Sequence, residues 1–247
     1  MSDTAPVFLV AEVPPGATFV LDGPEGRHAA AVRRLGPGED VVVADGAGGA
    51  AACVVDSVLG KDSLTLRVTR RWQDPPPRPR IVLAQALVKG DRGELAVELA
   101  TETGVDTVVP WRAERCVARW DDGPRGAKAL ARWRSTVREA AKQSRRTWVP
   151  EVTEPVSTAG LAALVESAAL AVVLDAAAPS GLTELDLPAD GDILVVVGPE
   201  GGISDRECAT LREAGAQVAR LGPTVLRAST TAAVAIAALG VMTTRWR

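Results

Sequence analysis

Four continuous apolar runs constrain the fold of this 247-residue chain more than any other feature of its sequence. They read RIVLAQALV (80–88), VDTVVP (105–110), LAVVLD (170–175) and DILVVVG (192–198). A strand that is apolar along its whole length has both faces buried, which is typical of parallel sheets covered by helices. Amphipathic helical segments, among them 92–104 and 126–146, separate the runs. These residues therefore predict an α/β domain with a mainly parallel sheet over 81–247.

The residues before this domain follow a different pattern. Over 39–72, short β-branched runs alternate with Asp-Gly, Gly-Gly and Gly-Lys-Asp, which is typical of antiparallel hairpins, and a short helix is expected over 26–35. The segment QDPPPRPR (73–80) has four prolines in eight residues and can continue neither a helix nor a central strand. We therefore predict a small β-rich barrel or sheet over 1–72 and a linker over 73–80.

Composition excludes several classes of protein. A hydrophobic content of 47% is ample for a buried core, and no basic and apolar leader is visible at the start of the chain. The longest apolar stretch, 230–242, is too short to span a bilayer, so we expect a cytoplasmic protein. Three distant cysteines and the single His28 argue against a disulfide framework, a metal site and a Ser-His triad.

The net charge of −3 hides a local excess of basic residues. Residues 112–146 contain 11 Lys and Arg against 4 Asp and Glu, and tryptophans occur within and beside this stretch at 111, 120, 133 and 148. Arginine binds phosphate and tryptophan can stack on an unpaired base, so the pattern favours an RNA partner. The alternative is a solvated basic helix whose tryptophans lie in the core, as we expect for Trp133.

Two glycine-containing loops follow predicted strands. The run LVVVGPEGGIS (194–204) ends on Gly-Pro-Glu-Gly-Gly, and ARLGPTVLRAST (219–230) ends a short strand on Gly-Pro before a Ser-Thr-Thr cluster expected to cap the last helix. Ligands bind beyond the carboxyl ends of parallel strands, so the two loops can face one pocket, although such turns are also common as structural punctuation. Neither loop has the residues of a P-loop or the GxGxxG spacing, which disfavours ATP and NAD.

The motifs together resemble the RsmE family, ribosomal RNA uridine-N3 methyltransferases of the SPOUT class. The resemblance rests on five segments of the second domain, and RHAAAVRRLGPGEDVVVADGAG (27–48) extends it into the first. These five are ALVKGDRGELAVELATETGVDTVVP (86–110), ERCVARW (114–120), REAAKQSRR (138–146), GPEGGISDRE (198–207) and LGPTVLRAST (221–230). Such a resemblance implies a PUA-like β-barrel, a SPOUT domain with a trefoil knot, S-adenosylmethionine as cofactor, and a homodimer with its site at the interface. The implied substrate is N3 of a uridine, uracil-1498, in 16S rRNA, as part of the 30S subunit.

Site residues are assigned in the light of this resemblance. We expect Arg227 to stabilise the uracil anion and Glu200 to accept or orient the proton. The expected cofactor-binding residues are Leu174, Gly198, Pro199, Gly201, Gly202, Leu221, Gly222, Val225 and Leu226. The expected RNA-binding residues are Arg33, Arg34, Arg115, Arg119, Arg138, Lys142 and Arg145, with Lys128, Arg132, Arg138, Lys142 and Arg145 sharing one helical face.

Two positions depart from the family pattern. Ser229 stands where family members commonly have a glutamate, and Val7-Phe8-Leu9 replaces an Arg-Phe-Phe pattern. Two other functions stay open: methylation of a different RNA atom, such as a ribose 2′-hydroxyl or a guanine nitrogen, and a non-catalytic RNA-binding assembly factor. The intact GPEGG segment argues against the second of these.

Overall fold

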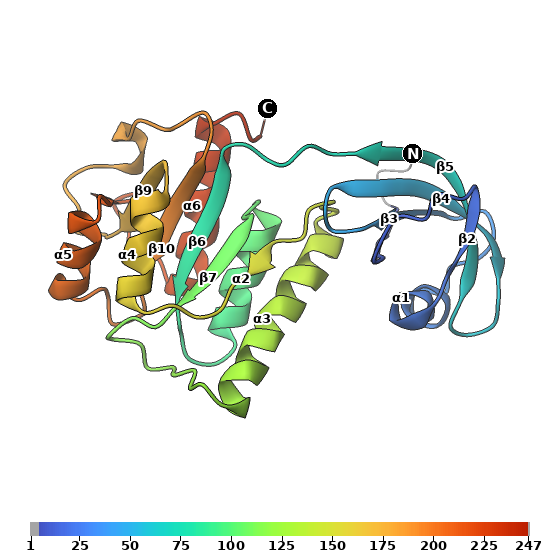
Figure 1. Cartoon of the computed structure of the whole chain (residues 1–247), viewed down its shortest axis with the longest axis horizontal. Helices are drawn as coiled ribbons and strands as arrows, with labels where there is room; N and C mark the ends of the chain where they lie inside the picture. Colours follow the sequence, from blue (N-terminus) through green and yellow to red (C-terminus); the bar gives the residue numbers. More distant parts are fainter. Residues whose placement is uncertain (1–4, 247) are drawn as a thin grey trace. The chain divides into compact units, whose positions relative to one another are not determined.

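The computed structural model describes residues 5–246 and divides the chain into two compact units (Figure 1). The first unit runs to Pro76 and also contains Ala141–Val149, and the second contains Pro77–Ala140 and the chain from Pro150 onward. Residues 141–149 were expected in the second domain. They belong to the first unit because backbone hydrogen bonds join them to the segment around Gly48. The Gly48 N–H donates to the Thr147 carbonyl and the Val149 N–H to the Gly46 carbonyl, while the Trp148 indole donates to the Asp74 carbonyl.

The first unit is built on a five-stranded sheet of order β1-β3-β4-β5-β2. Its strands are β1 (Val7–Leu9), β2 (Thr18–Leu21), β3 (Asp40–Ala44), β4 (Gly49–Val58) and β5 (Leu64–Gln73). The β-rich prediction is confirmed, but β1 pairs in parallel with β3 while the other pairs are antiparallel. The helix expected over 26–35 is α1 (Gly23–Arg27) followed by a π-helical turn (His28–Val32).

The second unit contains a six-stranded sheet of order β11-β9-β10-β6-β7-β8, in which every pair is parallel. Its strands are β6 (Arg80–Ala86), β7 (Thr107–Trp111), β8 (Glu151–Val152), β9 (Leu170–Leu174), β10 (Asp192–Val197) and β11 (Gln217–Ala219). The four apolar runs form β6, β7, β9 and β10, so the predicted parallel sheet is confirmed. Buried valines and leucines on both faces of these strands explain why the runs lack polar alternation.

Helices cover this sheet. They are α2 (Arg92–Glu102), α3 (Pro124–Gln143), α4 (Thr158–Ser167), α5 (Asp205–Glu213) and α6 (Ala228–Met242), with a 3-10 turn at Leu182–Glu184. Helix α2 packs on α6, α6 packs on β6 and β10, and α4 packs on α5 (Figure 1). None of the helices described is long and apolar enough to cross a membrane.

The start of helix α6 differs from expectation. The helix begins at Ala228, with Arg227 in extended conformation as its N-cap, so the Ser-Thr-Thr cluster lies in the first turn rather than at the cap. Part of the apolar surface of α6 is exposed, with Val234 41% and Val241 65% exposed. The residues of α6 that face the unit's core are Ala232, Ala235, Ile236 and Leu239.

Candidate functional site

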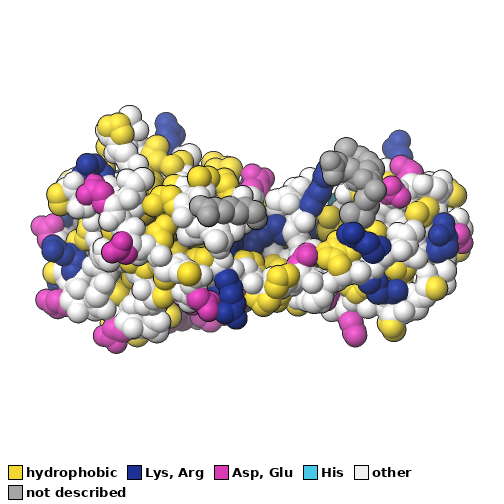
Figure 2. Space-filling model, turned by 90° about the horizontal axis from the view of Figure 1, so that it is seen from above, with side chains coloured by type: hydrophobic (Ala, Val, Ile, Leu, Met, Phe, Trp, Pro, Cys, Tyr) yellow, Lys and Arg dark blue, Asp and Glu magenta, His cyan; other side chains and the backbone are white. Residues whose placement is uncertain are grey.

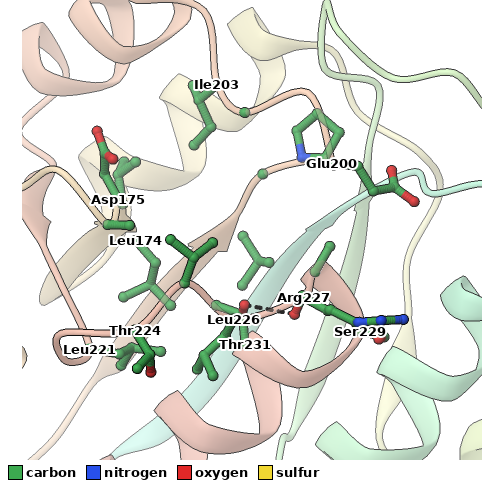
Figure 3. Close-up of a pocket in the computed structure, with 18 of the residues that line it drawn as sticks. Leu174, Asp175, Glu200, Ile203, Leu221, Thr224, Leu226, Arg227, Ser229 and Thr231 are labelled. Atoms are coloured by element: carbon green, nitrogen blue, oxygen red, sulfur yellow. Dashed lines mark hydrogen bonds between the residues drawn. The ribbon is translucent and has the colours of Figure 1, made fainter.

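A cavity of about 580 Å³ lies at the carboxyl ends of β9, β10 and β11 (Figure 3). Three segments form most of its wall: the end of β9, the loop after β10, and the loop that leads into α6. The lining residues include Leu174, Asp175, Gly198, Pro199, Glu200, Gly202, Ile203, Cys208, Leu221, Gly222, Thr224, Val225, Leu226, Arg227 and Ser229. The two glycine loops therefore do face one pocket.

The loop after β10 is a tight turn that requires glycine. Gly202 has φ of +73°, and its N–H donates to the Pro199 carbonyl at 2.9 Å. A Cβ on Gly198 would lie 2.6 Å from Cγ1 of Ile203. The turn then enters α5 through a capping box between Ser204 and Glu207, which holds the loop at a helix N-terminus.

The second loop leaves open space beside its backbone. A Cβ on Gly222 would have no atom within 4 Å, so the cavity reaches the main chain there. At the end of the loop, the Arg227 carbonyl accepts from the N–H groups of Thr230 and Thr231 and from Oγ1 of Thr231 at 2.9 Å. These bonds fix the Arg227 backbone, while its exposed guanidinium has no partner among residues 5–246.

Carboxylates and one thiol complete the wall. Glu200 lies 3.5 Å from the guanidinium of Arg92 at the start of α2, and Oδ1 of Asp175 accepts from the Ala177 N–H. Burial raises the pKa of the Cys208 thiol above its usual range. No group of three or more metal-ligating side chains occurs among the residues described.

Most of the predicted cofactor residues line the cavity, together with Glu200 and Arg227. The exception is Gly201, where a Cβ would instead meet Cβ of Arg115 at 3.3 Å. Sequence reasoning missed Arg92, Asp175 and Cys208. Asp175 could have been found, because it directly follows the apolar run of β9, whereas nothing in the sequence signals that Arg92 reaches Glu200.

The predicted RNA-binding residues occupy several places. Arg33, Lys142 and Arg145 line a small hollow of about 110 Å³ in the first unit, together with His28. Arg34 is exposed with φ of +55°, Arg138 is exposed on α3, and Arg115 donates to the Gly201 carbonyl at 3.2 Å. Arg119 lies beside a second cavity in the second unit.

The expected basic face of α3 is not formed as predicted. Lys142 is buried and its amine lies 3.1 Å from Oε1 of Glu25, while Arg145 lies beyond the last residue of the helix. Arg132 pairs with Glu94 at 3.1 Å. Trp133 is buried, as predicted for a core residue.

Comparisons with known proteins identify the family. Residues 75–240 match the model of an RNA methyltransferase domain, and residues 21–69 match that of an RNA methyltransferase PUA domain. The chain is 49% identical to ribosomal RNA small subunit methyltransferase E of Mycobacterium tuberculosis, over 98% of this chain and 94% of that protein. It is 30% identical to the protein of that name from Bacillus subtilis, over 92% and 91% of the two chains.

Solved structures agree with this assignment. A methyltransferase of Legionella pneumophila in complex with SAM is 27% identical with a TM-score of 0.84, over 97% of this chain and 98% of that one. Ribosomal RNA small subunit methyltransferase E of Neisseria gonorrhoeae, bound to S-adenosyl methionine, is 28% identical with a TM-score of 0.83, over 96% and 98%. The chain belongs to the ribosomal RNA small subunit methyltransferase E family.

Proposed function

We propose that this protein transfers a methyl group from S-adenosylmethionine to N3 of a uridine in 16S rRNA, at uracil-1498. The observation that carries the proposal is the meeting of two glycine loops around one cavity with the Arg227 guanidinium, which is unpaired among residues 5–246. Two structural relatives were solved with this cofactor bound.

The cavity fits the cofactor in size and chemistry. Its volume of about 580 Å³ lies within the range of small-molecule sites, and Leu174, Leu221 and Leu226 provide apolar surface. Open backbone at Gly222 can approach a ligand closely, and the carboxylates of Asp175 and Glu200 attract a cation. The bound cofactor supplies a methyl carbon made electrophilic by its sulfonium sulfur.

The chain's own residues control charge on the uracil. N3 of uracil carries a proton at neutral pH, so Glu200 accepts this proton as N3 gains the methyl group. The Arg227 guanidinium stabilises the negative charge that develops on O2 and O4. Ser229 is buried at the position of the family's usual glutamate. Among the carboxylates that line the cavity we assign this step to Glu200, which lies beside Arg92.

The test is methylation in vitro of RNA from a strain that lacks the gene. The protein is incubated with S-adenosylmethionine and either 30S particles or naked 16S rRNA, and the nucleosides are identified by mass spectrometry. We expect 3-methyluridine, formed faster on 30S particles. Methylation of a ribose or a guanine would contradict the proposal and show that the enzyme modifies a different RNA atom. Cofactor binding without any methylation would favour a non-catalytic assembly factor.

We further propose that the protein works in the cytoplasm as a homodimer packed through α6. Val234 and Val241 on this apolar helix are exposed, and hydrophobic side chains are visible on the surface of the second unit (Figure 2). Both observations support a second copy as the partner. Sedimentation should show a dimer at micromolar concentration. A stable, fully active monomer would contradict this part of the proposal.

A further inference from the structure

A second cavity, of about 440 Å³, lies at the carboxyl ends of β6 and β7. Its lining includes the ring of Trp120 and the charged side chains of Arg112, Glu114, Arg119, Asp121 and Asp122. Strand β6 is the neighbour of β10 in the sheet, so this cavity and the first one occupy the same edge. The proposed cofactor does not require it.

Trp120 provides a fixed aromatic surface in this cavity. It is partly exposed, and its ring meets that of Trp133 edge to face, with 4.8 Å between centroids and an angle of 76°. Trp133 is only 2% exposed and packs against Gly93 of α2, so it holds the Trp120 ring in place. A ring fixed in this way is a stacking platform for an unpaired base.

The charged residues around Trp120 suit one nucleotide rather than a simple anion. Arg112 pairs with Asp122 at 2.8 Å, whereas Arg119 has no hydrogen-bond or ion-pair partner within the described part of the chain and is free to bind a phosphate. The carboxylates of Glu114, Asp121 and Asp122 would repel an anion that has no base, such as inorganic phosphate. They can, however, accept hydrogen bonds from the N–H groups of a base edge.

Hydrogen bonds join this cavity to the loop of the first one. The buried Glu207 on α5 accepts from the Glu114 N–H at 2.8 Å and from Oγ1 of Thr158 at 2.9 Å, and it also caps the turn at Ser204. Arg115 donates to the Gly201 carbonyl. The loop that carries Trp120 is thus attached to the loop that borders the proposed cofactor.

We infer that this second cavity binds an unpaired nucleotide of the RNA that flanks the target uridine, with its base on Trp120 and its phosphate on Arg119. The inference rests on the proposed function for the identity of the RNA. It assigns to Trp120 a role in holding the substrate strand, beside a cofactor site that is built from other residues.

The test measures binding of a fluorescein-labelled uridine hexamer by anisotropy, without S-adenosylmethionine. Trp120→Ala should weaken binding about tenfold, because stacking on an aromatic ring is lost, and Trp120→Phe should stay within about threefold of the wild type. Thermal melting shows whether each variant is folded. Trp120→Ala should also raise KM for 30S particles while leaving cofactor affinity, measured by calorimetry, unchanged.

A second pair of variants does not depend on the packing of Trp120. Arg119→Gln should reduce the slope of log affinity against log salt by about one, because one phosphate contact is removed. Arg212→Gln is the charge-matched control, since Arg212 lies in the last turn of α5 and lines neither cavity.

Three results separate the inference from the proposed function. Unchanged hexamer binding and unchanged salt slope in both cavity variants would overturn the inference even if the wild type methylates uridine. Loss of dimerisation in Trp120→Ala, without a change in RNA affinity, would overturn it in favour of a second protein chain in the cavity. A wild type that binds the hexamer through Trp120 but forms no methylated RNA would support the inference and contradict the proposed function.

Discussion

The two cavities at the carboxyl edge of the parallel sheet are built from different parts of the chain. Backbone at Gly198, Gly202 and Gly222 contributes to the first, beside apolar side chains, whereas the second depends on the long side chains of Trp120 and Arg119. Figure 3 shows Glu200 and Arg227 toward one side of the first cavity and Asp175 on the opposite side. In the first cavity, replacing a glycine should abolish most ligand binding, because a side chain there occupies the space of the ligand. In the second cavity, each substitution should weaken ligand binding in proportion to the contact that it removes.

The largest effect is expected for Arg227→Ala. We expect kcat to fall about 10²- to 10³-fold, because a charge-stabilising group is removed from the reacting base. Cofactor affinity measured by calorimetry should change less than about twofold, since the N-cap bonds at this position come from the backbone. Arg227→Lys should recover part of the rate, and full activity in Arg227→Ala would remove the residue from the proposed chemistry.

The next effect tests the backbone-built cavity directly. Gly222→Val places a branched side chain in open space, so cofactor affinity should fall about 100-fold with the circular dichroism spectrum retained. Gly123→Val is the matched control, because a Cβ there also has no neighbour within 4 Å and the residue lines neither cavity. Gly201→Val, which points toward Arg115, should affect the cofactor less than Gly222→Val. The opposite order would show that the loop is arranged differently.

A smaller effect separates buried from exposed basic residues in the first unit. Lys142→Met leaves Glu25 buried without this partner, and the free energy of unfolding should fall by about 3 kcal/mol in urea titrations. Combining it with Glu25→Leu should restore most of the stability. The control Arg33→Gln, exposed beside the same hollow, should leave stability unchanged and lower the salt slope of RNA binding. Equal stability of all three variants would contradict the burial of this pair.

The smallest effect is expected in the alkylation rates of two cysteines, Cys208 in the first cavity and Cys116 in the second. Burial raises the pKa of both the Cys208 and Cys116 thiols, so alkylation by iodoacetamide at pH 8 should be slow and should accelerate as the pH rises. S-adenosylmethionine should slow the reaction of Cys208 a few-fold, and the uridine hexamer should slow that of Cys116. Cys53, whose pKa burial raises to about 11, is the unreactive internal control. Protection of both Cys208 and Cys116 by either ligand alone would mean that the cavities do not bind separately.

The sequence predicted the parts that depend on local pattern. Continuous apolar runs identified β6, β7, β9 and β10, and the two Gly-Pro segments identified the loops of the first cavity. The trefoil knot implied by the family resemblance stays a prediction.

The parts that depend on tertiary packing were not predictable. Charge counting could not show that Lys142 is buried against Glu25, because the two residues are 117 positions apart. It also gave no sign that Gly201 faces Arg115, that 141–149 pack with the first unit, or that the rings of Trp120 and Trp133 meet edge to face. Long side chains reach partners that no local periodicity encodes.

The measurement that tests the central proposal most directly uses S-adenosylmethionine with a trideuterated methyl group. The wild-type protein and Gly222→Val are each incubated with 30S particles from a strain that lacks the gene. The RNA is then digested to nucleosides, whose masses are determined by mass spectrometry. We predict that the wild type yields trideuterated 3-methyluridine at a single position and that Gly222→Val yields almost none. Label on a ribose or on another base, or equal labelling by the two proteins, would contradict the proposal.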